Sequence, residues 1–288
     1  MQNVINSEVE GNIILVLGGT GKTGRRIVSQ LRDKGLSVRI GSRSENPGFE
    51  WYDQSTWAPA LEGVRAVYIS FYPDLAVPGA VDAIQAFTDL ALNIGIKHLV
   101  LLSGRGEEEA QKCEQIVQNS GADWTILRAS WFAQNFSEAF MRDLVLSGEV
   151  ALPAGEVKEP FIDADDIADV AVAALTEDGH SGELYELTGP RLMTFTETVK
   201  EISEAAGFEV RYTQIPNQAF VDAMVKEGVP QEYVQLVNYL FTEVLDGRNS
   251  YVCDGVQRAL GRKPRDFSEF ARKAASEGAW QVGEVANG

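Results

Sequence analysis

Residues 12–24 constrain the fold more than any other stretch of the chain, because an apolar run ends there in evenly spaced glycines. The run Ile13–Leu17 has the pattern of a buried parallel strand. Gly18, Gly21 and Gly24 follow it, and an amphipathic segment typical of a helix comes next. A strand, a glycine turn and a helix in this order form a phosphate-binding unit, since an anion can lie on the free N–H groups at the helix N-terminus.

Two kinds of phosphate site share parts of this pattern. The run Gly21-Lys22-Thr23 matches the end of a Walker A loop, which needs another glycine five residues before its Gly-Lys pair. That position is Val16, inside the apolar strand, so a nucleotide hydrolase is excluded. What remains is a dinucleotide-binding loop, in which the three glycines allow the turn, the approach of the pyrophosphate and the packing of the helix expected at about 22–34.

Length, charge and cysteine usage limit the class of protein. The 288 residues suffice for one large α/β domain, or for one domain with a small cap. A net charge of −17 makes nucleic acid and anionic membranes unfavourable partners. No apolar run reaches the length of a membrane span, and residues 1–11 lack the apolar core of a signal peptide. Cys113 and Cys253 are far apart, so we expect reduced thiols and a cytoplasmic location.

Strand and helix patterns alternate through the first half of the chain, which predicts an α/β fold with a doubly wound parallel sheet. After the first strand and helix, we expect strands at 37–42, 66–71, 97–103 and 124–127, a short segment near 49–52, and helices at 79–93, 107–119 and 132–146. Later elements are helices at 163–175, 194–206 and 217–241 and extended segments at 184–187 and 210–215. The predicted domains are a polar tail (1–11), a dinucleotide-binding Rossmann domain (12–150, completed by 161–190), a smaller, mostly helical C-terminal substrate portion (191–275) and a tail (276–288).

Carboxylates cluster at the start of the helix expected at 163–175. Asp163, Asp165 and Asp166 suit the positive end of a helix, so we interpret them as capping residues. A metal site is the alternative, but no histidine or cysteine joins them, and the chain has only two histidines. We therefore expect no metal.

The end of the second strand bears on the choice of dinucleotide. NAD-binding proteins place an acidic residue about 20 positions after the glycines, where it bonds the ribose 2′-hydroxyl. Here Ser42 and Arg43 stand at that place, and no acid occurs before Glu45. A hydroxyl and a planar cation suit a 2′-phosphate, and Lys22 adds a second positive charge. NADP(H) is favoured, with the alternative that Arg43 is an ordinary exposed turn residue.

The usual proton-donating pair of short-chain dehydrogenases is missing. None of the eight tyrosines has a lysine four residues later, so no Tyr-x-x-x-Lys pair can act as the acid. Ser103 ends a strand at the carboxyl edge where such sheets bind ligands, and Lys112 either faces the same cleft or is an ordinary surface lysine. A serine hydrolase is excluded, because residues 101–106 lack the glycine two positions before the serine.

Five motifs together resemble the NmrA-like branch of atypical short-chain dehydrogenases. In chain order they are Gly18–Gly24, Thr125–Arg128, Trp131–Asn135, Phe161–Ala168 and Leu187–Pro190, and the resemblance covers about residues 12–270. Within that branch, Trp51–Trp57 and Leu152–Gly155 are similar to the ergot-alkaloid-type reductases (festuclavine and agroclavine dehydrogenases), which reduce an iminium C=N bond. Bacterial relatives occur where no ergot alkaloid is made, so the resemblance does not give the substrate.

The resemblance implies roles for matched positions. The pyrophosphate would lie on Gly18, Thr20, Gly21, Lys22, Thr23 and Gly24. The 2′-phosphate would lie on Ser42 and Arg43, the nicotinamide ribose along Phe71, Tyr72 and Ser103, and the substrate beside Trp131, Phe132 and Asn135. Members of this branch usually lack the Tyr-x-x-x-Lys pair, so Ser103, Lys112 and Tyr72 stay candidate catalytic residues with no role assigned.

The expected function is NADP(H)-dependent reduction of a small cyclic imine or iminium, quinone or enone. The negative charge favours a cationic substrate, and Trp131, Phe132, Phe136 and Tyr239 either stack on a flat ring or pack in the core. Two alternatives stay open: a redox-sensing regulator that binds a protein partner, and a cyclase or isomerase that keeps the dinucleotide as a scaffold. The sequence leaves the oligomeric state undetermined.

Overall fold

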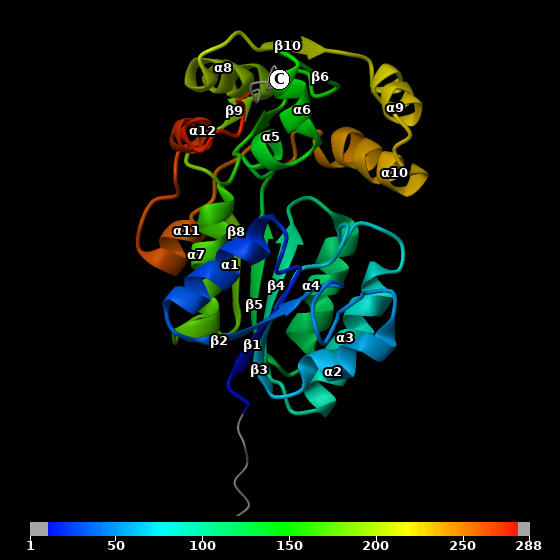
Figure 1. Cartoon of the computed structure of the whole chain (residues 1–288), viewed down its shortest axis with the longest axis vertical. Coiled ribbons are helices and arrows are strands. Elements are labelled where there is room, and N and C mark those ends of the chain that lie inside the picture. Colours follow the sequence, from blue (N-terminus) through cyan, green and yellow to red (C-terminus); the bar gives the residue numbers. More distant parts are fainter. Residues whose placement is uncertain (1–10, 282–288) are drawn as a thin grey trace, which may run out of the picture. The chain divides into compact units, whose positions relative to one another are not determined.

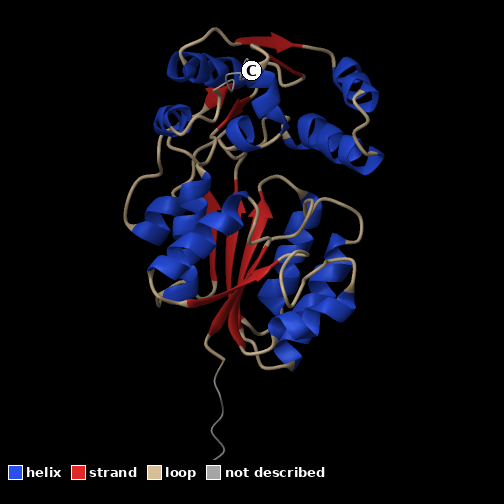
Figure 2. Cartoon of the chain, viewed as in Figure 1, coloured by secondary structure: helices blue, strands red, loops and turns tan. Residues whose placement is uncertain are grey.

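Six strands form one sheet in the order β2-β1-β3-β4-β5-β8 (Figures 1 and 2). The computed structural model describes residues 11–281. The pairs β1–β2, β1–β3 and β3–β4 are parallel, which confirms the predicted α/β class with a doubly wound sheet. The strands are β1 (Ile13–Leu17), β2 (Ser37–Gly41), β3 (Val64–Ile69), β4 (His98–Gly104), β5 (Asp123–Ala129) and β8 (Glu183–Leu187).

Helices cover both faces of this sheet, with α1 on one face and α3 and α4 on the other (Figure 1). Residues 14–17 of β1 are fully buried, which explains the continuous apolar run, because a strand covered on both faces has no polar side. The helices that connect the first strands are α1 (Lys22–Asp33), the short α2 (Trp57–Leu61), α3 (Ala80–Asn93) and α4 (Glu108–Asn119).

Contacts divide the chain into two compact units. The first contains the described residues up to Ser103, with 109–126 and 171–183. The second contains 104–108, 127–170 and the described residues from Leu184 onward. Each unit is built from several stretches, so the linear division into 12–150 and 191–275 stays a prediction.

The second unit has a core rich in aromatic side chains. Phe136, Phe161 and Phe195 are buried and contact one another at ring-centroid distances between 5.2 and 6.1 Å. The elements after β5 are α5 (Asn135–Glu138), α6 (Phe140–Leu146), β6 (Glu149–Leu152), β7 (Lys158–Glu159), α7 (Ala164–Thr176), β9 (Met193–Thr194), α8 (Phe195–Ala206), β10 (Arg211–Gln214), α9 (Asn217–Lys226), α10 (Gln231–Tyr239), a π-helical turn (Leu240–Val244), α11 (Gly255–Leu260) and α12 (Phe267–Ser276).

Two predicted helices are interrupted in the structure, and a third segment, for which no element type was predicted, forms only a bridge. The helix expected at 132–146 is two short helices, because Ala139 has an extended backbone between them. The helix expected at 217–241 is interrupted after α9 by Gly228, whose φ is +74°, and by Pro230. The segment near 49–52 contributes only an antiparallel bridge between Glu50 and Asp53.

The predicted tails lie mostly outside the described residues, which begin at Gly11 and end at Gln281. Within the tail expected at 276–288, Trp280 is buried, and its indole N–H donates to the Phe136 carbonyl at 2.8 Å. The chain therefore still contributes to the core at residue 280. No helix in the described range is both long and apolar enough to cross a membrane.

The carboxylates at the start of α7 have two different roles, helix capping and pairing with arginines. Asp163 accepts the backbone N–H of Asp165 at 2.8 Å, which confirms its capping role. Asp166 is fully buried, forms an ion pair with Arg262 and accepts a hydrogen bond from the Arg265 guanidinium. Within residues 11–281, no group of histidine, cysteine or acidic side chains has the arrangement of a metal site.

Candidate functional site

The glycine loop between β1 and α1 leaves a place for an anion. A Cβ on Gly24 would lie 2.1 Å from the Gly18 carbonyl oxygen, so only glycine allows this approach of turn and helix. Gly18 has a φ of +64°, and the Gly21 N–H donates to its carbonyl at 2.8 Å. At the N-cap of α1, Gly21 has no side chain to bond the helix N–H groups, and the first turn contains no acid. This backbone cradle fits a pyrophosphate.

The side chains of the loop point in different directions. Thr20 is exposed, whereas Thr23 is buried and its hydroxyl accepts a 2.9 Å hydrogen bond from the Tyr68 hydroxyl. Burial raises the pKa of Tyr68 well above its usual value, so this donor stays protonated. The Thr23 hydroxyl therefore holds α1 to β3, and a ligand would meet the backbone of Thr23 instead. The Lys22 carbonyl accepts from the Arg26 guanidinium at 2.7 Å.

The loop after β3 lies beside the glycine turn at the point where the sheet order changes direction. A Cβ on Gly18 would be 3.4 Å from the Ser70 side chain, and the Trp51 indole donates to the Ser70 carbonyl at 3.1 Å. Phe71 is buried against Trp51, with ring centroids 4.8 Å apart, whereas Tyr72 is 57% exposed. Open α/β sheets bind ligands at such a switch point, and Tyr72 and Tyr52 are exposed aromatic side chains there.

The loop after β2 places an acid next to the candidate 2′-phosphate residues. It closes through a 3.0 Å hydrogen bond from the Phe49 N–H to the Ser42 carbonyl. The Arg43 side chain is 76% exposed, and its Nε lies 3.6 Å from Oε2 of Glu50. Sequence reasoning missed Glu50, because only the closed loop brings it back beside Arg43.

Two of the candidate catalytic residues, Ser103 and Lys112, each bond a glutamate of α4. Ser103 is buried, and its hydroxyl donates to Oε1 of the buried Glu114 at 2.6 Å. Lys112 is half-exposed and pairs with Glu109, one turn earlier on α4, at 2.6 Å. The contacts therefore link Ser103 with Glu114 and not with Lys112.

The candidate substrate residues belong to the second unit. Trp131 is partly buried, and its ring packs against Phe241 at 5.1 Å and edge-on to Phe195 at 5.9 Å. Phe132 forms a bridge with Ile162 and is partly exposed, as are Asn135 and Tyr239. The sequence left two roles open for four aromatic residues, stacking on a flat substrate or packing in the core. One of the four, Phe136, is fully buried and packs in the core.

The sequence pattern also missed three buried polar residues of the second unit. Arg105 and Ser130 directly follow β4 and β5, and the Arg105 guanidinium donates to the Ser130 hydroxyl at 2.9 Å. Glu159 is 1% exposed. Burial raises the pKa of Glu159 to about 7, while the charge of Arg105 and hydrogen bonds from the Trp131 N–H and the Ser130 hydroxyl act in the opposite direction. Arg105 and Ser130 could have been found from the sequence, because each is a polar residue directly after the end of a strand.

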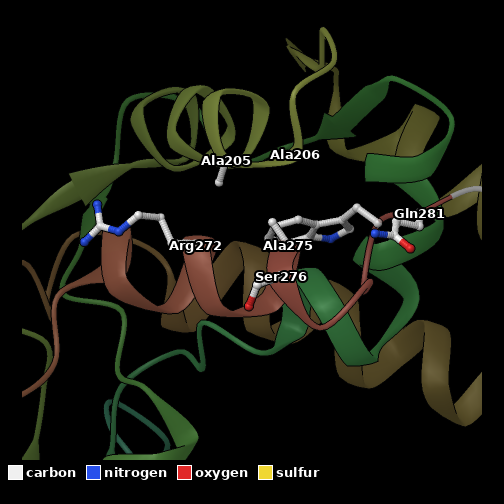
Figure 3. A pocket seen from close by; sticks show the side chains of 7 residues that line it. Ala205, Ala206, Arg272, Ala275, Ser276 and Gln281 are labelled. Atoms are coloured by element: carbon white, nitrogen blue, oxygen red, sulfur yellow. The ribbon is translucent and has the colours of Figure 1, made fainter.

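One surface hollow of the second unit lies between α8 and α12 and measures about 340 Å³ (Figure 3). Arg272 and Gln281 lie at its opposite ends in Figure 3, and its lining also includes Trp280 and three alanines. None of the predicted site residues lines it. A second hollow, of about 470 Å³, lies along β2 and is lined partly by Arg32 and Arg39.

Comparison with known proteins gives a family match over most of the chain. The model of the NmrA-like family matches residues 10–271. Prestalk A differentiation protein A of Dictyostelium discoideum is 31% identical over 91% of this chain and 92% of its own length. The NAD(P)H azoreductase of Xenophilus azovorans is 32% identical over 92% and 98%. An agroclavine dehydrogenase of Claviceps fusiformis is 28% identical over 89% and 95%, in agreement with the ergot-type motifs.

Solved structures share the fold at lower identity. The Citrobacter sp. triphenylmethane reductase complexed with NADP(H) has a TM-score of 0.71 and 21% identity, with 91% of this chain and 99% of that one covered. NmrA, a negative transcriptional regulator in complex with NAD, has a TM-score of 0.68 and 18% identity, with 94% and 97% covered. Both an enzyme and a regulator are therefore built on this fold.

Proposed function

Because the chain belongs to the NmrA-like family, we propose that it is an NADP(H)-dependent reductase of a small organic molecule. The observation that carries the proposal is the Gly18–Gly24 loop, where a Cβ on Gly24 would meet the Gly18 carbonyl and no side chain caps the start of α1. The similarity to an NAD(P)H azoreductase and to an agroclavine dehydrogenase supports an oxidoreductase that uses a nicotinamide dinucleotide. A bound NADPH would supply the hydride.

The residues that would hold the dinucleotide belong to the first unit. The backbone of residues 18–24 would bind the pyrophosphate through N–H groups at the start of α1. Ser42 and Arg43 would bind the 2′-phosphate, with a hydroxyl and a guanidinium that is largely exposed. Phe71, Tyr72 and Ser103 would lie along the nicotinamide ribose, and Lys22 would add positive charge to the loop.

A cyclic imine or iminium, a quinone and an enone are the substrate classes that fit this chemistry. Trp131, Phe132, Asn135 and Tyr239 would border the substrate, and the partly exposed rings among them can stack on a flat molecule. The net charge of −17 favours the approach of a cation. Reduction of an iminium carbon needs little beyond orientation, because the positive nitrogen takes up the electron pair.

The experiment that tests the proposal follows the NADPH absorbance with a panel of probes. The panel contains menadione, 2-cyclohexenone, 1-pyrroline and N-methyl-3,4-dihydroisoquinolinium. We expect consumption of NADPH with at least one probe, and a lower kcat/KM for NADPH in Arg43→Ala. If wild-type protein binds NADPH tightly and oxidises it with no probe, the reductase proposal is wrong.

A redox-sensing regulator is the second candidate. The likeness to the solved NmrA regulator and the absence of a Tyr-x-x-x-Lys pair favour it. Such a protein would bind a partner in only one redox state of the dinucleotide. Affinity capture in NADPH and, in parallel, in NADP⁺ tests this, since a reductase without a regulatory partner gives the same captured proteins in both.

A further inference from the structure

A chain of three buried polar groups follows the carboxyl ends of β4 and β5. The Arg105 N–H donates to the Ala129 carbonyl at 3.1 Å, which joins the segments that leave the two strands. The Ser130 hydroxyl lies between two partners: it accepts from the Arg105 guanidinium at 2.9 Å and is hydrogen-bonded to the Glu159 carboxyl group. Arg105, Ser130 and Glu159 are each 3% exposed or less.

Glu159 is held in an environment that suits a neutral carboxyl group. Its Oε1 has no hydrogen-bond partner in the part of the chain that the structure describes. A buried carboxylate needs several donors to be stable, so an unpaired oxygen favours the protonated acid. Across the β7–β9 pair, Glu159 faces Met193, which carries no charge. On its own strand, Lys158 is exposed.

The charged group that acts on Glu159 is Arg105, and its guanidinium is engaged elsewhere. It donates to the carbonyls of Asn249 and Tyr251 at 3.3 and 3.4 Å and lies 4.4 Å from the centre of the Tyr251 ring. Arg105 therefore lowers the pKa of Glu159 without forming a direct ion pair with it, and burial still raises that pKa to about 7. The acid is then close to half-protonated at neutral pH.

The same carboxyl group contacts the candidate substrate residues through the backbone. The Trp131 N–H is hydrogen-bonded to Glu159, and Trp131 follows Ser130 directly. The Ser130 hydroxyl, which is hydrogen-bonded to Glu159, therefore directly precedes the segment that carries Trp131, Phe132 and Asn135.

We propose that Glu159 stores the proton of the reduction and that the Ser130 hydroxyl passes it to the substrate. This rests on the proposed reductase function and assigns the proton donor that the missing Tyr-x-x-x-Lys pair leaves open. Addition of a hydride to the β-carbon of an enone breaks the C=C π bond and leaves an enolate. One proton from Ser130 completes the ketone, while Ser130 takes the proton of Glu159, which becomes a carboxylate and is reprotonated from water.

A preformed iminium needs no such proton. Its C=N π pair moves to the positive nitrogen when the carbon accepts a hydride, and the product is a neutral amine. The two substrate types therefore separate a role in proton delivery from a role in packing, because a packing defect slows both reductions.

The first test compares kcat for 2-cyclohexenone and for N-methyl-3,4-dihydroisoquinolinium in the wild type, Glu159→Gln and Ser130→Ala. We expect both variants to lose about 100-fold with the enone, the usual size of general acid catalysis, and less than about twofold with the iminium. The wild-type kcat for the enone should fall as pH rises above 7, and Glu159→Gln should remove this dependence. Glu156→Gln, at an exposed glutamate three residues earlier, is the matched control.

Equal losses with both substrates, or no loss with the enone, would overturn the proposal. A second measurement needs no turnover: the infrared C=O band of a neutral carboxyl group, followed from pH 5 to pH 9. We expect a band that disappears near pH 7 in the wild type and in Glu156→Gln and is absent from Glu159→Gln. Lack of that band in the wild type also overturns the proposal, even if neither probe is reduced. Failure of both reductions with the band present counts against the reductase function alone.

Discussion

At the scale of single residues, Arg43 and Glu50 set the charge that a 2′-phosphate would meet. The closed loop after β2 holds the Glu50 carboxylate 3.6 Å from the Arg43 guanidinium. A phosphate bound to Arg43 would gain charge-assisted hydrogen bonds and lose energy to repulsion by Glu50. If the 2′-phosphate binds Arg43 as proposed, discrimination between NADPH and NADH would depend on both side chains.

Substitution of these two residues should have opposite effects on NADPH binding. Arg43→Ala should weaken NADPH by at least about 10-fold, since hydrogen bonds to charged groups contribute roughly 1.5–3 kcal/mol. Glu50→Gln should strengthen NADPH a few-fold, and neither change should alter NADH by more than about twofold. Fluorescence titration with both dinucleotides measures this, with Glu45→Gln in the same loop as the control. Equal losses of NADPH and NADH in Arg43→Ala would show that the 2′-phosphate lies elsewhere.

Glu159 gives a prediction for the pH dependence of stability. Burial raises its pKa from 4.5 to about 7, so the folded protein binds more protons than the unfolded chain between these values. The contribution to stability is present below pH 4.5 and is lost as pH rises to 7, by roughly 3 kcal/mol at most. Urea unfolding of the wild type and Glu159→Gln from pH 4.5 to 8 should show this loss only in the wild type. Parallel pH profiles would mean that Glu159 is already ionised at pH 5.

At the scale of elements, several side-chain pairs join segments that are far apart in sequence, and local sequence patterns do not predict such pairs. The apolar run of β1 and the three glycines are adjacent in sequence, so their strand, turn and helix could be predicted. Asp166 on α7 and Arg265 are 99 residues apart, and no local sequence pattern predicts that they pair. Glu50 and Glu159 were missed for the same reason, since a folded loop and a two-residue strand bring them to Arg43 and Ser130.

The pairing of α7 with the segment before α12 should be costly to break. Asp166 is fully buried and pairs with the side chain of Arg262. It also accepts hydrogen bonds from the Arg265 guanidinium and, at 2.7 Å, from the Arg265 backbone N–H. Asp166→Asn should destabilise the protein by about 1.5–3 kcal/mol, because the buried charged acceptor of the Arg265 backbone N–H is lost, while Asp169 still pairs with both arginines. Urea denaturation checks this against Asp178→Asn, an exposed aspartate just after α7. A change below about 1 kcal/mol would mean that Asp169 alone is sufficient to hold both arginines.

The turn from β1 to α1 should tolerate no side chain at its third glycine. In Gly24→Ala the new methyl group would meet the Gly18 carbonyl, so the helix must move away from the turn. We expect a lower melting temperature and a loss of NADPH affinity of about 10-fold or more, as the cradle of N–H groups widens. Ser29→Ala, on the exposed face of the same helix, should change neither quantity. Unaltered NADPH binding in folded Gly24→Ala would remove the loop from the site.

At the scale of the whole molecule, the family match and the sheet agree with a protein that binds a nicotinamide dinucleotide. The NmrA-like family model covers residues 10–271, and the sheet presents its glycine turn at the switch point between β1 and β3. The same fold supports a reductase and a regulator among solved structures, so the fold alone does not separate them. Transfer of a hydride from NADPH to a substrate distinguishes a reductase from a regulator.

The most direct measurement uses NADPH that carries deuterium at both C4 positions of the nicotinamide, with mass spectrometry of the products from 2-cyclohexenone, 1-pyrroline and N-methyl-3,4-dihydroisoquinolinium. A reductase should place one deuterium on the carbon of the reduced C=C or C=N bond and consume one NADPH for each product molecule. NADPH that binds but is not consumed, or a product formed without deuterium, would contradict the proposed reductase function.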